Sequence, residues 1–212
     1  TAATTILLLY PAMLSAVPLF AFGGASLACV LIYILAWHDG VDPVRIILSG
    51  VAINTVLGAY NAFLQMLNSD NLSNVLAFMN GSLSGCNWEQ IYVISAYSLI
   101  GLICGFACIK SANILQLGDE MASGLGVNVS RVRILLSAVG AFLAAATVSV
   151  AGMIGFIGLV VPHIARMMVG SDYRALLPVS TLLGAFLLLA ADTLGRTLVT
   201  GMEIPVGIIM AA

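Results

Sequence analysis

Residues 1–37, TAATTILLLYPAMLSAVPLFAFGGASLACVLIYILAW, contain no charged side chain. A helix needs roughly 20 apolar residues to cross the hydrocarbon core of a bilayer, so this stretch is long enough for one complete span and part of another. Pro11 and Pro18 divide it, because proline breaks the hydrogen-bond pattern of a helix interior. The sequence therefore predicts a membrane-spanning helix over residues 15–37.

The composition of the whole chain also indicates a lipid environment. Hydrophobic residues make up 61% of the 212 residues and charged residues 8%, whereas soluble domains carry about 25% charged residues. Seven basic and nine acidic side chains are too few to cover a soluble surface of this size. The net charge of −2 argues against a nucleic-acid partner. We predict an all-α, polytopic transmembrane helical bundle.

Polar residues divide the rest of the chain into further predicted spans, over residues 44–67, 88–109, 132–151 and 176–194, with another opening at residue 204. The apolar segment 156–169 is too short to cross about 30 Å by itself as a helix. We therefore expect six to seven spans. Both ends of the chain lie in apolar sequence, which is the pattern of a transmembrane domain over residues 1–212 that is truncated at both ends.

The basic residues give the predicted bundle an orientation. When the predicted spans alternate in direction, six of the seven fall on one side: Arg45, Lys110, Arg131, Arg133, Arg166 and Arg174. Only Arg196 falls on the other. Loops rich in Lys and Arg stay in the cytoplasm, so we predict that the side with six basic residues is cytoplasmic.

The longest cytoplasmic connection, residues 110–130, ends in GDEMASGLGVNVS. Asp119 can cap a short helix, Gly124 and Gly126 suit a turn with positive φ, and Ser130 can cap the next span. The pattern predicts a short helix, a glycine turn and a long helix. It fits an ordered loop and a docking element for a cytoplasmic partner equally well.

The segment GMIGFIGLVVPHIARMMVGSDYR, residues 152–174, has the pattern of a broken or re-entrant element. Pro162 suits the first turn of a helix that ends at Gly170. His163 is interpreted as bonding groups near the helix start, with a proton relay or a metal ligand as alternatives. We expect the glycines of this segment to permit close helix contact: Gly152, Gly155 and Gly158.

Two polar patterns remain. Asp192 and Arg196 are four residues apart on one helical face, where they can pair, either as a functional pair or as a plain helix-end pair. Four amides share one face of the predicted span 44–67 and its end: Asn54, Asn61, Gln65 and Asn68. They indicate a wet cavity, which we favour, or a hydrogen-bonded seam between helices.

Five motifs carry a resemblance to a known family: ILSGVAIN (47–54), NGSLSG (80–85), LGDEMASGLGV (117–127), GMIGFIGLVVPHIARMMVGSDYRALLP (152–178) and ADTLGRTLVTGMEIPVGI (191–208). In this order they resemble the permease subunits of iron-siderophore and cobalamin ABC importers, the FecCD-like or type II importer family. The resemblance implies that the chain is the later two-thirds of a ten-span permease.

The resemblance also implies roles for individual residues. Contact with the ATPase, through a cytoplasmic coupling loop over residues 110–130, falls to Gly118, Asp119, Glu120, Ala122, Leu125, Gly126 and Val127. Docking of a binding protein falls to Arg196 and Glu203. The pathway is expected to be lined by Asn54, Asn61, Gln65 and Asn68. Structural motif positions are Gly155, Gly158, Pro162, His163, Arg166, Asp192 and Pro205.

The function implied is a multi-pass permease of the bacterial cytoplasmic membrane that imports a ferric siderophore, with cobalamin or haem as alternatives. Its implied partners are a second permease copy or close paralogue, cytoplasmic ATP-binding subunits, a periplasmic or lipid-anchored substrate-binding protein and membrane lipid. No cofactor, metal site or catalytic residue is expected, and the absence of a Walker motif assigns ATP hydrolysis to a separate subunit. A proton-driven transporter using His163 and Asp192, and an intramembrane enzyme, are the rival hypotheses.

Overall fold

The computed structural model describes residues 1–9, 17–36, 43–67, 72–83, 86–198 and 204–211. Within these ranges the chain forms helices and no strand, which confirms the predicted all-α fold. The helices are α1 (Ala2–Leu9), α2 (Val17–Ala36), α3 (Pro43–Leu67), α4 (Leu72–Asn80), α5 (Trp88–Ala107), α6 (Ile109–Leu115), α7 (Asp119–Gly124), α8 (Val129–Ala151), α9 (Ile157–Val169), α10 (Tyr173–Thr197) and α11 (Val206–Ala211).

Five of these helices, α2, α3, α5, α8 and α10, are long and apolar enough to cross a membrane. They match the complete spans predicted from the sequence, although α10 begins three residues before the predicted range 176–194 and ends three residues after it. Helix α9 has 13 residues, or about 20 Å of helix, and is too short to cross alone, as predicted. The partial spans predicted at the two ends of the chain correspond to the short helices α1 and α11, which with the five long helices give the seven of the prediction.

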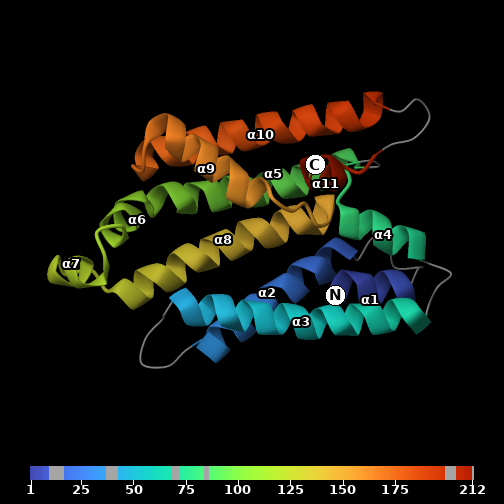
Figure 1. Cartoon of the computed structure of the whole chain (residues 1–212), viewed down its shortest axis with the longest axis horizontal. Helices are drawn as coiled ribbons and strands as arrows, with labels where there is room; N and C mark the ends of the chain where they lie inside the picture. The colour runs from blue at the N-terminus through green and yellow to red at the C-terminus, as the bar shows by residue number, and fades with distance from the viewer. Residues whose placement is uncertain (10–16, 37–42, 68–71, 84–85, 199–203, 212) are drawn as a thin grey trace.

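The spans pack as a bundle in which α2 contacts α3 and α8, α8 contacts α5, and α10 contacts α9. Figure 1 shows α6, α7 and the turn between α9 and α10 at one end of this bundle, and α4 with the end of α10 at the other. We call these the inner and the outer end. The six basic residues predicted to share a side all lie in elements that begin or end at the inner end, and Arg196 lies in the last turn of α10.

Packing between the spans uses small and aromatic side chains, and much of the apolar surface faces outward. Phe22, Tyr97 and Phe142 form a ring cluster between α2, α5 and α8, with centroids 5.7–5.9 Å apart. Large side chains such as Leu19 and Leu182 are more than 70% exposed. Such surface is costly in water and costs nothing in lipid, so the exposure pattern agrees with a membrane bundle.

Three chain segments meet at the outer end through backbone hydrogen bonds. The Ser82 N–H donates to the Ala151 carbonyl (3.0 Å), the Met153 N–H to the Phe78 carbonyl (3.0 Å) and the Gly207 N–H to the Gly81 carbonyl (3.4 Å). These bonds join the end of α4, the end of α8 and the start of α11. We call this crossing the glycine junction, after Gly81, Gly152 and Gly207.

Glycine is required at this junction because the three backbones touch. A Cβ added at Gly81 would lie 2.6 Å from the Met153 carbonyl oxygen, and one at Gly207 would overlap the Asn80 carbonyl oxygen. Gly152, with φ of +72°, would overlap the Phe78 carbonyl in the same way. The predicted close contact at Gly152 therefore exists, but with the backbone of α4. The prediction is wrong for Gly155 and Gly158, where an added Cβ would meet no atom of the described residues within 4 Å.

A strained turn separates α8 from α9. Phe156 has φ of 65° and ψ of −37°, and the Ile157 N–H donates to the Gly155 carbonyl (2.8 Å). This is a γ-turn of the rare kind with positive φ at its centre. Because α9 begins at Ile157, Pro162 lies inside the helix, so its prediction as a first-turn residue is wrong. The predicted end is correct, since Gly170 caps α9 with φ of 82°.

Candidate functional site

The inner end carries a unit of two short helices, α6 and α7, where the sequence predicted one helix. Gly118 is the N-cap of α7, with φ of 96°, so the predicted cap at Asp119 is wrong. The cap of α8 is Asn128, whose side chain accepts from the Arg131 N–H, and not Ser130. Gly126 has the predicted positive φ of 78°.

The sequence predicted that both Gly124 and Gly126 lie in the turn after the short helix. Gly126 does, but Gly124 is the last residue of α7 and has no positive φ. The Gly126 N–H donates to the Ser123 carbonyl (2.9 Å), and the Val127 N–H donates to the Ala122 carbonyl (3.1 Å). These bonds close the end of α7 and turn the chain toward α8.

Helix α7 is anchored on one side and exposed on the other. Ala122 is fully buried, and the carboxylate of Asp119 pairs with the guanidinium of Arg133 on α8 (2.9 Å). Met121 and Leu125 are 64% and 63% exposed and, being four residues apart, lie on one face. Glu120 is exposed in the first turn. The unit thus presents an apolar face beyond the spans at the end rich in basic residues.

A second set of hydrogen bonds ties α6 to the turn before α10. The Asn113 amide nitrogen donates to an Asp172 carboxylate oxygen (2.7 Å), and the Asn113 amide oxygen accepts from the Tyr173 N–H (3.0 Å). The Gln116 amide donates to the Ser171 carbonyl (2.9 Å). We call this set the α6–α10 latch.

The Asp172 carboxylate serves both the latch and the cap of α10, where it accepts from the Arg174 N–H (2.9 Å). The pKa of Asp172 lies below its usual range because this backbone N–H, and then the Asn113 amide, stabilise the ionised form. A depressed pKa keeps the carboxylate ionised at every pH above that range. No sequence pattern had pointed to Asn113, Gln116 or Asp172.

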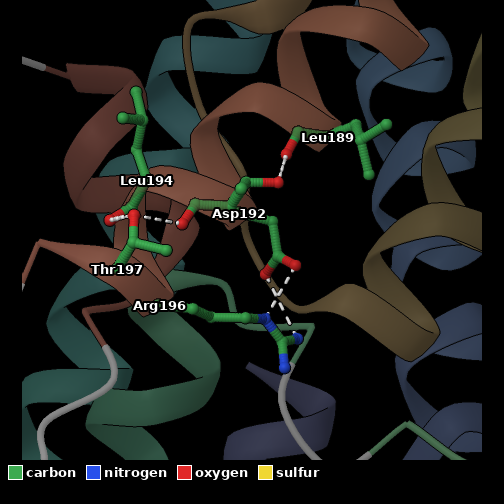
Figure 2. A network of polar contacts seen from close by, with 6 residues as sticks. Leu189, Asp192, Leu194, Arg196 and Thr197 are labelled. Carbon is green, nitrogen blue, oxygen red and sulfur yellow. Dashed lines mark hydrogen bonds and ion pairs between the residues drawn. The ribbon is translucent and has the colours of Figure 1, made fainter. Parts of the chain in front are cut away.

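The outer end carries the predicted Asp192–Arg196 pair. The Arg196 Nε lies 2.9 Å from one Asp192 carboxylate oxygen, and a terminal guanidinium nitrogen lies 3.3 Å from the other. Figure 2 shows the two groups facing one another. In the same turns the hydroxyl of Thr197 donates to the Leu194 carbonyl (3.3 Å). The Arg196 side chain is 48% exposed. Glu203 lies outside the described residues.

Two of the amides predicted to share one face of α3, Asn61 and Gln65, contact neighbouring helices. The Thr4 hydroxyl donates to Asn61, and the Gln65 amide lies 3.4 Å from the Met79 sulfur. These contacts join α3 to α1 and α4, so for Asn61 and Gln65 the hydrogen-bonded seam is correct rather than the favoured cavity. Asn54 is exposed, and Asn68 lies outside the described residues.

Helix α9 holds His163 and Arg166 on its exposed surface. The exposed His163 side chain makes no hydrogen bond to the residues that the structure describes, so the interpretation that it bonds groups near the helix start is wrong. Among the described residues, no three His, Cys, Asp or Glu side chains group as metal ligands.

Pro205 directly precedes α11, and its carbonyl accepts from the Ile208 N–H (3.0 Å).

The order of these features along one all-helical bundle agrees with a family comparison: residues 1–212 match the FecCD transport family. The chain belongs to this family. It is 40% identical over 205 residues to the Fe(3+)-citrate import system permease protein YfmD of Bacillus subtilis, covering 97% of this chain and 61% of the relative. To the hemin transport system permease protein HmuU of Yersinia pestis it is 42% identical, over 88% of this chain and 56% of the relative.

A solved structure supports the same assignment. It is the inward-facing conformation of an ABC transporter assigned to the metal-chelate type, with a TM-score of 0.83 and 27% identity over 99% of this chain and 67% of that chain. As a FecCD chain with five span-length helices, this is a multi-pass membrane protein. The chain spans about 60% of the length of the FecCD relatives described above.

Proposed function

We propose that this chain is part of the permease subunit of an ABC importer in the bacterial cytoplasmic membrane, which moves a ferric siderophore or related iron chelate inward. ATP hydrolysis belongs to a separate cytoplasmic subunit. The permease forms a dimer with a second copy or a close paralogue, and an outer binding protein delivers the substrate. The chain itself acts as a transport subunit and carries no catalytic residue.

The observation that carries this proposal is the α6–α7 unit at the inner end. Met121 of α7 and Leu125, the residue that caps its C-terminus, expose apolar side chains, while buried Ala122 and the Asp119–Arg133 pair hold the helix in place. This unit and the turn after it contain the residues proposed to contact the ATPase: Gly118, Asp119, Glu120, Ala122, Leu125, Gly126 and Val127. An exposed apolar face on an ordered cytoplasmic element is suited to a partner protein.

The substrate class rests on the relatives. The relatives named for Fe(3+)-citrate and for hemin are 40% and 42% identical to this chain. Sequence identity therefore does not favour one of these two substrates over the other. We propose the iron chelate, with haem or cobalamin as alternatives. A path with exposed amides such as Asn54 suits a bulky polar chelate better than a bare cation, which prefers carboxylates. Asn68 is also proposed to border this path, whereas Asn61 and Gln65 belong to the seam that joins α3 to α1 and α4.

The proton-driven alternative would use Asp192 and His163 as a relay. Asp192 is instead paired with Arg196 in the outer turns of α10, and His163 lies on the exposed surface of the separate helix α9. Proton relays use titratable side chains within the membrane. The observed placement therefore favours ATP-driven transport.

Arg196→Glu in the full-length permease is expected to weaken docking of the outer binding protein about tenfold at low salt. The family resemblance implies that Arg196 meets acidic residues of the binding protein, and the substitution replaces a half-exposed cation by an anion that they repel. Asp192→Asn is the matched control. It removes the pairing carboxylate and keeps Arg196, so its affinity should stay at or above the wild-type value. The measurement is the dissociation constant on immobilised transporter. Equal affinity of Arg196→Glu and the wild type at low salt would reject the docking role.

A further inference from the structure

Helix α10 links the two ends at which the proposed transporter meets its partners. It has 25 residues and is continuous through Pro178, which corresponds to a length of about 37 Å. Arg196 lies in its last turn at the outer end, and Asp172 caps its first turn at the inner end. A displacement of α10 as a rigid helix would therefore appear at both ends.

The α6–α10 latch is the set of side-chain bonds that joins this helix to the α6–α7 unit. Asn113 uses both the donor and the acceptor of its amide, on the Asp172 carboxylate and the Tyr173 N–H. Gln116, almost one turn further along α6, bonds the Ser171 carbonyl. Because the three hydrogen bonds come from two positions along α6, Asn113 and Gln116, they fix the direction of α6 as well as its distance from α10. Hydrogen bonds to a charged group are also about twice as strong as neutral ones.

The latch differs from a second tether of the unit. The Asp119–Arg133 pair ties α7 to α8 within the same local stretch, 14 residues apart. The latch joins residues 55 to 60 positions apart in the sequence. It connects the unit to the helix that carries Arg196, whereas α8 ends at the glycine junction and carries no docking residue. Long-range contact between two rigid elements is the physical requirement for coupling distant sites.

We propose that the α6–α10 latch is the joint through which docking of the binding protein at the outer end of α10 changes the position of the α6–α7 unit against the ATPase. Asn113 is the positioning residue of this joint. The inference rests on the proposed importer function and adds to it the route of the signal and the residues that carry it. The latch stays closed during the cycle, so that α6 and α10 move together.

The test uses charge placement across the latch in the full-length transporter, reconstituted with its ATPase subunit. Asn113→Asp sets a second carboxylate against Asp172 and breaks their bond, while the acceptor for the Tyr173 N–H remains. Asp172→Asn alone keeps an oxygen for the cap of α10 and for Asn113. Combining both substitutions restores one amide and one carboxylate in exchanged positions. Each variant is also checked by its thermal unfolding midpoint.

Stimulation of ATP hydrolysis by the loaded binding protein should fall about fivefold or more in Asn113→Asp, the scale of a typical coupling energy. Basal hydrolysis and docking affinity should stay at wild-type values, and the unfolding midpoint should fall by no more than a few degrees, because one exposed hydrogen bond is lost. Asp172→Asn and the exchanged pair should recover stimulation. Unchanged stimulation in Asn113→Asp, or a parallel loss of basal hydrolysis and stability, would overturn the latch proposal. A wild-type transporter that shows no stimulation would instead reject the importer function itself.

Discussion

Gly207→Ala in the full-length protein is expected to lower the thermal unfolding midpoint by about 10 °C or to prevent accumulation in the membrane. The added Cβ would overlap the carbonyl oxygen of Asn80, and the Gly207 N–H bonds the Gly81 carbonyl of the same segment. Both are backbone groups, so the clash cannot be relieved by a change of rotamer. A backbone clash this severe lies at the upper end of the cost of overpacking, about 3 kcal/mol or more, and each kcal/mol is worth about 2–4 °C in a domain of 150–250 residues.

Gly184→Ala is the control for this prediction. Gly184 lies within α10, and an added Cβ would be 3.7 Å from the Val161 Cγ1, an ordinary contact. Alanine is also the better helix former by about 1 kcal/mol, so this variant should unfold at or above the wild-type temperature. The comparison is made by thermal unfolding in detergent. Equal midpoints for the two variants would show that α4 and α11 do not cross as described.

Met121→Asp combined with Leu125→Asp is expected to reduce ATP-driven uptake by about tenfold or more while the protein still folds. Both side chains are mostly exposed, so their replacement disturbs little internal packing. In the proposed complex each apolar side chain would contribute about 1.5–3 kcal/mol when buried against the ATPase subunit. A carboxylate at either position would instead have to be desolvated. The measurements are retention of the ATPase subunit during purification, and uptake.

Ser123→Asp is the matched control, because it adds one carboxylate to the same short helix. Ser123 is exposed. It lies two residues from Met121, so it points to a different side of α7. We expect this variant to retain the ATPase subunit. If the double variant also keeps the subunit and normal uptake, the face of Met121 and Leu125 is not the contact surface.

The spans were predictable from the sequence because a long apolar segment in lipid has one solution, the helix. Polar residues then placed most ends within a few positions. Errors arose where local signals compete: Gly118 replaces Asp119 as cap because its φ of 96° is open to glycine, and Asn128 caps α8 ahead of Ser130. Helix α6 was missed because its residues were assigned to a polar connection.

Contacts between segments far apart in the sequence were beyond prediction from spacing. The Asp192–Arg196 pair was predicted because one helix turn sets its geometry. Asp172 could have been found as a cap before the apolar run of α10, but its second partner, Asn113, lies 59 residues away. The glycine junction likewise depends on how α4, α8 and α11 cross. The γ-turn at Phe156 had no signal, since an aromatic residue rarely adopts positive φ.

The most direct test of the proposed function is uptake into proteoliposomes that hold the full-length permease and its ATPase subunit, with loaded binding protein outside. The substrate is a ferric siderophore labelled with radioactive iron. We predict uptake that requires ATP inside the vesicle and that an inward proton gradient neither replaces nor enhances. Uptake that continues without the ATPase subunit and follows the proton gradient would contradict the account.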